Sequence, residues 1–180
     1  MIEPRSQPPS RALLVIVAVV AWVVDQTTKT LVVQNLALGE NWAPFPALAR
    51  FFTFTHTTNT GAAFGLFPDA GWIFVIVAII VISAILFYYR HLPTEHLLVR
   101  VSLGLQLGGA LGNLTDRLVR GSVVDFLDFK IWPVFNVADS CIVVGVAILA
   151  FYLMREEQPR PAPQSLATSP PSDSDRGQPS

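Results

Sequence analysis

Charged residues and cysteine are both scarce in this 180-residue chain. Only 14% of its residues are charged, against the roughly 25% that is usual in a soluble domain. The single cysteine, Cys141, excludes an intramolecular disulfide and, inside an apolar run, is expected to be a small buried hydrophobe. The twelve basic residues are scattered and the formal net charge is -1, so the basic stripe of a nucleic-acid-binding protein is missing.

Hydrophobic residues are abundant instead, at 52% of the chain, and the mean hydropathy is +0.49. These values predict an integral membrane protein. About 20 residues of helix cross the hydrocarbon core of a bilayer, and four apolar stretches fit such spans: Ala12 to about Val33, Gly71 to Tyr89, Arg100 to Asp116, and about Val134 to Met154. The predicted fold class is therefore all-α, a four-transmembrane-helix bundle.

A small β-like element is expected beside the bundle. The segment ARFFTFTHTT, residues 49–58, alternates Phe and Thr, which predicts short strands at the membrane interface. With the loop around it, this segment would form an extracytoplasmic, interfacial element between the first two spans.

The two ends of the chain are predicted to lie outside the folded unit. Residues 1–10 are expected to be a disordered N-terminal tail and residues 11–154 the transmembrane domain. Residues 155–180, rich in Pro, Ser and Gln, are expected to be a second disordered tail. The first span follows Arg5 and Arg11 like a signal peptide, but it lacks a small-residue cleavage site and runs on into Asp25 and Lys29. It is therefore interpreted as a retained anchor.

Basic residues orient the four spans weakly. An even number of spans puts both termini on one side, and loops rich in Lys and Arg favour the cytoplasm. Seven basic residues would then lie inside and five outside, the latter being Lys29, Arg50, Arg117, Arg120 and Lys130. Both termini are predicted to be cytoplasmic.

Polar clusters mark the opposite ends of the spans. In an up-down-up-down bundle, exits of odd spans and entries of even spans meet on one face, and all the clusters occupy these places: Asp25 with Lys29, Asn59, Asn113 with Asp116 and Arg117, and Asn136 with Asp139. Ionisable groups at membrane depth are functional candidates because they are costly there. The pattern predicts a site near the outer leaflet.

Spacing along the predicted helices leaves simpler interpretations open. Asp25 and Lys29 are four residues apart, which also suits an ion pair on a helix surface. Asn113, Asp116 and Arg117 share a helical face, either as a polar site or as snorkelling interfacial groups. Small residues four apart on the third span predict close helix packing without chemistry: Gly104, Gly108 and Gly112.

Two further motifs have local structural interpretations. Asn136 followed by Asp139 is typical of a capping box, which can coexist with catalysis. Asn59 before Gly61 is typical of a turn, in which the asparagine side chain bonds its own backbone. The small residues that begin at Gly61 would also let an extended peptide or a lipid approach closely.

Five ordered motifs together resemble the lipoprotein signal peptidases, the type II signal peptidases of bacteria. They are DQTTK (25–29), NTGAAFG (59–65), GGALGNLTDR (108–117), VVDF (123–126) and FNVADS (135–140). The resemblance covers roughly Ala12 to Met154 and leaves out both tails. The segment that joins VVDF to FNVADS is shorter than in many members. The resemblance therefore does not extend to the details of a flap beside the site, whereas the aspartate pair is unaffected.

The resemblance implies an aspartic endopeptidase of the bacterial cytoplasmic (inner) membrane. It would remove the signal peptide from a diacylglyceryl-modified prolipoprotein, cutting before the lipidated cysteine, with Asp125 and Asp139 as the catalytic pair. Membrane lipid and a globomycin-type inhibitor are further expected partners, and neither a cofactor nor a metal is expected. Substrate-binding or supporting roles are predicted for Asp25, Lys29, Asn59, Gly61, Asn113, Asp116, Arg117, Asn136 and Ala138, Asp116 being expected to be structural.

The apolar setting of the two aspartates suits this chemistry. Two close carboxylates in a poorly hydrated site cannot both ionise cheaply, so they share a proton and titrate as a coupled pair. One then acts as the base that activates water, and the other as the acid that protonates the leaving amine. Asp128 and Asp116 are rivals for a place in this pair, because spacing alone does not exclude them.

Other chemistries explain fewer of the motifs. HLPTEH, His91 to His96, has the wrong spacing for a zinc site and is interrupted by proline. A Ser/Lys protease could combine Ser122 or Ser140 with Lys29 or Lys130. A proton-coupled carrier would place polar groups through the midplane, and a lipid-binding scaffold would leave two acids in the apolar region unexplained.

Overall fold

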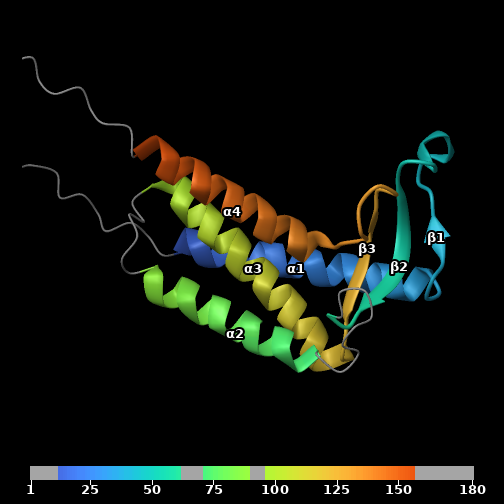
Figure 1. Cartoon of the computed structure of the whole chain (residues 1–180), viewed down its shortest axis with the longest axis horizontal. Coiled ribbons are helices and arrows are strands. Elements are labelled where there is room, and N and C mark those ends of the chain that lie inside the picture. The colour runs from blue at the N-terminus through green and yellow to red at the C-terminus, as the bar shows by residue number, and fades with distance from the viewer. Residues whose placement is uncertain (1–11, 62–70, 90–95, 157–180) are drawn as a thin grey trace, which may run out of the picture.

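Four long helices make up most of the computed structural model, which describes residues 12–61, 71–89 and 96–156 (Figure 1). They are α1 Ala12–Asn35, α2 Gly71–Tyr88, α3 Leu97–Arg120 and α4 Val137–Glu156. Helices α1, α3 and α4 are long and apolar enough to cross a membrane, and α2 is apolar but shorter, at 18 residues. The predicted helical membrane class is confirmed, while the number of helices that cross the bilayer stays a prediction.

Helix α3 lies in the middle of the bundle and packs against α1, α2 and α4 (Figure 1). Glycine makes its contact with α1 close. A Cβ on Gly104 would lie 2.8 Å from the Cβ of Val17, and one on Gly108 would lie 2.5 Å from the carbonyl oxygen of Ala18. The regular glycines therefore serve helix packing, as their spacing predicts.

A small antiparallel sheet crosses one end of the bundle (Figure 1). Its strands are β1 Asn41–Trp42, β2 Thr53–Asn59 and β3 Val123–Asp128, in the order β1-β2-β3. The β-like element predicted from the Phe/Thr alternation is therefore present as β2. The VVDF motif, which was not expected to be a strand, forms β3 after α3 ends at Gly121, a residue in the left-handed region with φ 79°.

Helix α4 begins at Val137, three residues later than the predicted start near Val134. Phe135 is held in extended conformation by a bridge to Leu127 of β3, so the chain cannot turn into a helix before it. Asn136 then caps the helix: its Oδ1 accepts from the Asp139 N–H at 2.9 Å, and its own N–H donates to Asp139 Oδ2 at 3.3 Å. The predicted capping box is present. The helix also continues to Glu156, two residues past the predicted end of the domain, and the rest of both predicted tails lies outside the described residues.

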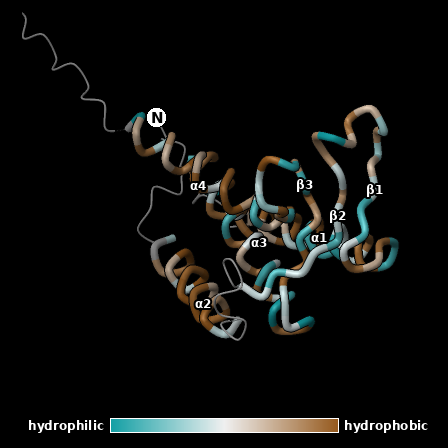
Figure 2. Tube along the Cα trace, turned by 45° about the vertical axis from the view of Figure 1, so that its right-hand side comes forward, coloured by the Kyte–Doolittle hydropathy of each residue, from teal (hydrophilic) through white to brown (hydrophobic). Residues whose placement is uncertain are grey.

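Apolar and polar residues separate along the bundle (Figure 2). Helix α2 is hydrophobic on its outward faces, where Trp72, Ile80 and Phe87 are 60% or more exposed, an arrangement that suits contact with hydrocarbon. The hydrophilic residues gather toward the sheet. A small apolar cluster of Val32, Val124 and Phe126 joins the end of α1 to β3 and fixes the sheet against the helices.

Candidate active site

Asp125 and Asp139 come together where β3 meets the first turn of α4. Asn136 contacts both carboxylates: its Nδ2 donates to Asp125 Oδ1 at 2.6 Å, and its backbone N–H donates to Asp139 Oδ2. Asp125 is buried, at 3% exposure, whereas Asp139 is half-buried. Water and a substrate can therefore approach the pair from the side of Asp139.

Two more asparagines donate to the carboxylate oxygens of the pair that Asn136 does not contact. Asn113 of α3 donates from Nδ2 to Asp139 Oδ1 at 2.7 Å, and Asn59 at the end of β2 donates from Nδ2 to Asp125 Oδ2 at 3.0 Å. The Oδ1 of Asn59 also accepts from the N–H of Gly61 at 2.8 Å. The predicted turn is thus present, and the same side chain reaches Asp125.

Lys29 is a buried cation that contacts one of these asparagines, Asn113. Its Nζ lies 2.9 Å from Asp25 Oδ2 and 2.9 Å from Asp116 Oδ2, and all three side chains have 0% exposure. It also donates to Asn113 Oδ1 at 3.0 Å. The interpretation of Asp25 and Lys29 as a surface ion pair is therefore wrong, because tertiary packing of α3 covers this face of α1.

Each of the two carboxylates paired with Lys29 also accepts a backbone hydrogen bond from a segment that carries one aspartate of the acid pair. Asp25 Oδ1 accepts from the N–H of Ala138 at 2.9 Å, at the start of α4, and Asp116 Oδ2 accepts from the N–H of Val124 at 3.1 Å, in β3. Ala138 is fully buried. Burial of ions is costly unless each is paired and hydrogen-bonded, and this network meets that condition while tying α1, α3, β3 and α4 together.

Asp128, the rival for the pair, lies apart from it. Its Oδ2 accepts from Lys130 Nζ at 2.5 Å and from Thr55 Oγ1 at 2.8 Å. Burial favours a higher pKa for Asp128, but these hydrogen bonds outweigh it and hold the pKa below its usual range. Asp116 is engaged with Lys29 and with β3, which fits the structural role expected of it.

Burial raises the pKa of Asp125 to about 6. The nearby charge of Asp139 adds to the rise, whereas the hydrogen bonds from Asn59 and Asn136 oppose it. The folded protein therefore binds this proton more tightly than the unfolded chain does. A carboxyl group of this kind can hold the shared proton of a coupled pair.

Stability should depend on pH through this group. The contribution of Asp125 to stability is fully present below its ordinary pKa of 3.8 and is lost as the pH rises through about 6. We expect wild type to lose stability relative to Asp125→Asn across this window, measured as unfolding midpoints in detergent. Because the pKa of Asp128 is lowered, its linkage has the opposite sign and lies below pH 3.8, so the stability difference between wild type and Asp128→Asn should stay constant across this window. A constant difference between wild type and Asp125→Asn from pH 3.8 to 6 would contradict the assignment.

Several contributors to the site were missed in the sequence. Gln26 donates from Nε2 to Asp25, to Asp116 and to the carbonyl of Gly112 at 3.1–3.2 Å. Arg120 forms a close ion pair with Asp116. Gln26 belongs to the DQTTK motif, and Arg120 follows Asp116 at helical i+4 spacing, so both signals were available.

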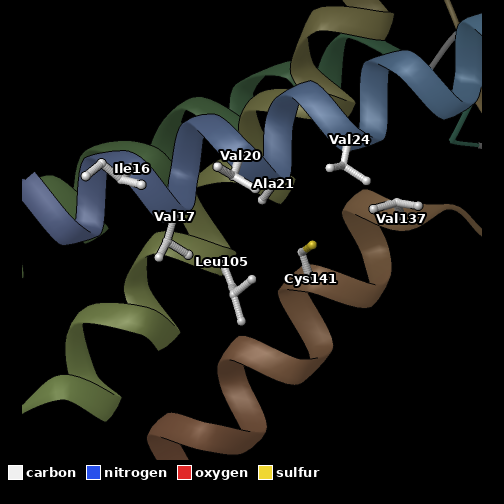
Figure 3. Close-up of a pocket in the computed structure, with 8 residues that line it drawn as sticks. All are labelled: Ile16, Val17, Val20, Ala21, Val24, Leu105, Val137 and Cys141. Atoms are coloured by element: carbon white, nitrogen blue, oxygen red, sulfur yellow. The ribbon is translucent and has the colours of Figure 1, made fainter.

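An apolar groove of about 320 Å³ runs between α1 and α4 with α3 at its floor (Figure 3). Its lining carries no charged side chain: Ile16, Val17, Val20, Ala21, Val24, Leu105, Val137 and Cys141. Val137 and Cys141 are each two residues from Asp139, which places them on the opposite side of α4. The groove is therefore separate from the acid pair.

Among the residues described, no three His, Cys, Asp or Glu side chains gather as a metal site requires, and His91 to Glu95 of HLPTEH lie outside this part.

Comparison with known proteins gives one consistent family. A sequence model described as Signal peptidase (SPase) II matches residues 17–155. A lipoprotein signal peptidase of Desulfitobacterium hafniense is 47% identical over 140 residues, covering 77% of this chain and 91% of that protein. One from Halothermothrix orenii is 42% identical over 146 residues, covering 81% and 98%.

Two solved structures are similar to this chain in fold. A bacterial membrane enzyme determined by the in meso method at 2.3 Å resolution superposes with a TM-score of 0.76 and 29% identity, covering 85% of this chain and 94% of that one. A second, at 1.9 Å, gives a TM-score of 0.74 and 31% identity. The family model spans most of the chain and the relatives are more than 40% identical to it, so the chain belongs to the signal peptidase II family.

Proposed function

We propose that this chain is an aspartic endopeptidase that removes the signal peptide of diacylglyceryl-modified prolipoproteins by cutting before the lipidated cysteine. Membership of the family makes it a membrane peptidase of lipoprotein processing. The observation that carries the aspartic mechanism is the bridging of Asp125 and Asp139 by Asn136. Because one residue holds both carboxylates, through its side-chain amide and its backbone N–H, we expect both to lie within reach of one water molecule.

The two acids have different environments, which suggests different roles. Asp139 is in the first turn of α4, where the helix dipole favours a negative charge. The raised pKa of Asp125 makes it the site that we assign to the shared proton in the singly protonated pair. Asp139 then takes a proton from the attacking water, and Asp125 donates a hydrogen bond to the scissile carbonyl oxygen.

The reaction is completed by proton return. Attack by the hydroxyl oxygen forms the new C–O bond of a tetrahedral intermediate, and its collapse breaks the C–N bond as the proton passes to the departing amine. Asn59, Asn113 and Asn136 keep the carboxylates in place through these steps. No covalent intermediate with the enzyme is needed, and we propose no cofactor.

The Ser/Lys alternative has little support in this geometry. Lys29 is held by two carboxylates and an amide, and Lys130 pairs with Asp128, so neither amine is placed as a free base. The hydroxyl of Ser140 donates to the carbonyl of Asn136 within its own helix. A carrier remains the alternative from another class, and the gathering of polar groups at one end of the bundle argues against it.

We place both termini in the cytoplasm and the acid pair near the outer leaflet of the cytoplasmic membrane. Two features support this orientation: the basic residues at the far end of the bundle, such as Arg100 and Arg155, and the hydrophilic residues that gather toward the sheet at the other end (Figure 2). A reporter fused after Glu156 should be active only if it functions in the cytoplasm. Activity of a periplasm-specific reporter at this position would reverse the orientation.

The function is tested by cleavage of a defined substrate. Purified protein in lipid-containing micelles should cut a diacylglyceryl-modified prolipoprotein, and mass spectrometry should find the lipidated cysteine at the new N-terminus. The same precursor without the lipid should be cut far more slowly, and a globomycin-type cyclic peptide should inhibit the reaction. Equal cleavage of both precursors, or cleavage at another bond, would refute the proposed specificity.

A further inference from the structure

Arg117 is a charged residue beside the acid pair with few polar supports of its own. Its positive charge interacts with both Asp139 and Asp125. Nη1 donates to the carbonyl of Asn113 at a long 3.3 Å, and the buried Nε has no hydrogen-bond partner within the described part of the chain. Hydrogen bonds alone therefore define the position of this guanidinium poorly.

An aromatic ring from another helix provides the missing support. The guanidinium carbon of Arg117 lies 5.2 Å from the ring centroid of Phe74, over the face of the ring. A cation over an aromatic face is attracted by the ring quadrupole, and more strongly where water is excluded. Phe74 is the fourth residue of α2, at the helix end nearest the sheet.

The same ring also contacts the turn that supports Asp125. A Cβ added to Gly61 would overlap the Phe74 ring, and Gly61 has φ 89°, so this position needs glycine for both space and conformation. The N–H of Gly61 bonds Asn59, whose amide donates to Asp125. Phe74 thus lies between supports of the acid pair that come from two separate segments.

Phe74 is less exposed than the two residues that precede it in α2. Trp72, two residues earlier, is 63% exposed, whereas Phe74 is 36% exposed in spite of its place on the same lipid-facing helix. Of the described helices and strands, α3 is the main one against which α2 packs. Phe74 therefore gives this end of α2 a contact with the supports of the acid pair.

We propose that Phe74 is a positioning residue of the active site: its ring, seated on Gly61, holds the guanidinium of Arg117 beside Asp125 and Asp139. The inference rests on the proposed peptidase function. Phe74 acts through Arg117 and does not touch the reacting atoms. Its role requires an aromatic face, so a side chain of similar volume without one should fail.

Kinetics separate this role from simple packing. Phe74→Leu should lower kcat about tenfold with KM changed less than twofold, whereas Phe74→Tyr, which keeps the ring, should retain at least half of the wild-type kcat. Trp72→Leu, which removes an aromatic from the same helix end, should match wild type. In an Arg117→Gln background, Phe74→Leu should have no further effect. Equal losses in the Leu and Tyr variants, a loss confined to KM, or independent effects in the double variant would overturn the proposal.

A measurement that needs no turnover tests the placement directly. In ¹⁵N-labelled protein, the Nε–H signal of Arg117, assigned by its absence in Arg117→Gln, should be shifted upfield by the ring current of Phe74. The shift should disappear in Phe74→Leu and persist in Phe74→Tyr and Trp72→Leu. An unshifted signal in the wild type would refute the proposal even if the protein is an active peptidase. Wild-type protein that cleaves no prolipoprotein would instead refute the proposed function, and this signal would still decide where Arg117 is held.

Discussion

Replacement of Asp125 or Asp139 by asparagine is expected to reduce prolipoprotein cleavage by about 100- to 10,000-fold, the usual contribution of a general acid or base. Asparagine keeps the size of the side chain but can neither take a proton from water nor donate one to the leaving amine. Its oxygen can still accept from Asn136 or from Asn113, so the fold should survive. Initial rates with the lipidated precursor measure the loss, and unfolding midpoints check the fold.

Asp128→Asn is the matched control for this pair of variants. Asp128 is on the same strand as Asp125 but bonds Lys130 and Thr55 instead of the site. Its variant should cut within about twofold of the wild-type rate, since it removes no group that takes part in proton transfer. Near wild-type cleavage by Asp125→Asn or Asp139→Asn, in folded protein, would exclude the aspartic mechanism.

Replacement of Lys29 by methionine is expected to have the largest effect on stability. The change leaves Asp25 as a buried carboxylate without a cation and leaves Asp116 with Arg120 alone, and breaking a buried pair in this way costs about 3–5 kcal/mol. The N–H groups of Ala138 and Val124 would also lose well-placed acceptors, so activity should fall with stability. Denaturant titration in mixed micelles measures the free energy of unfolding.

Two variants show whether charge burial is the cause. Lys130→Met removes a lysine whose pair with Asp128 is partly exposed, at 35% for the lysine side chain, and should cost no more than about 1 kcal/mol. Asp25→Asn added to Lys29→Met should recover part of the loss, because one uncompensated carboxylate is removed. If Lys29→Met is as stable as Lys130→Met, the buried network does not hold the site together.

Most residues that surround the acid pair could be named from the sequence, because polar side chains are energetically costly to place in a membrane-spanning segment. Asp25, Asp116 and Asn136 are polar groups beside or within apolar helices, where chance rarely leaves them. Up-and-down topology then predicts that they meet at one end of the bundle, and the network around Lys29 joins them there. Their catalytic and supporting roles stay predictions.

The residues alone did not show whether Asp125 or Asp128 lies beside Asp139, and the tertiary structure was needed to distinguish them. Both follow apolar residues in the same short segment, and only its pairing with β2 directs Asp125 toward Asn59 and Asp128 toward Thr55. Phe74 was missed for a similar reason. A phenylalanine in an apolar helix gives no signal of its own, and its role depends on two residues distant in sequence, Gly61 and Arg117.

The sequence by itself determined that the chain is a helical membrane protein with its polar groups at one end. Hydrophobicity and the cost of burying charge are properties of each residue and its neighbours along the chain, so both can be predicted from the sequence. Tertiary structure alone decided that Lys29 is a buried cation instead of a surface partner of Asp25, that Asn136 bridges Asp125 and the helix cap, and that α2 reaches the site. These outcomes depend on which side chains of separate helices and strands share a space, and hydrogen bonds between such partners form only when packing excludes water around them.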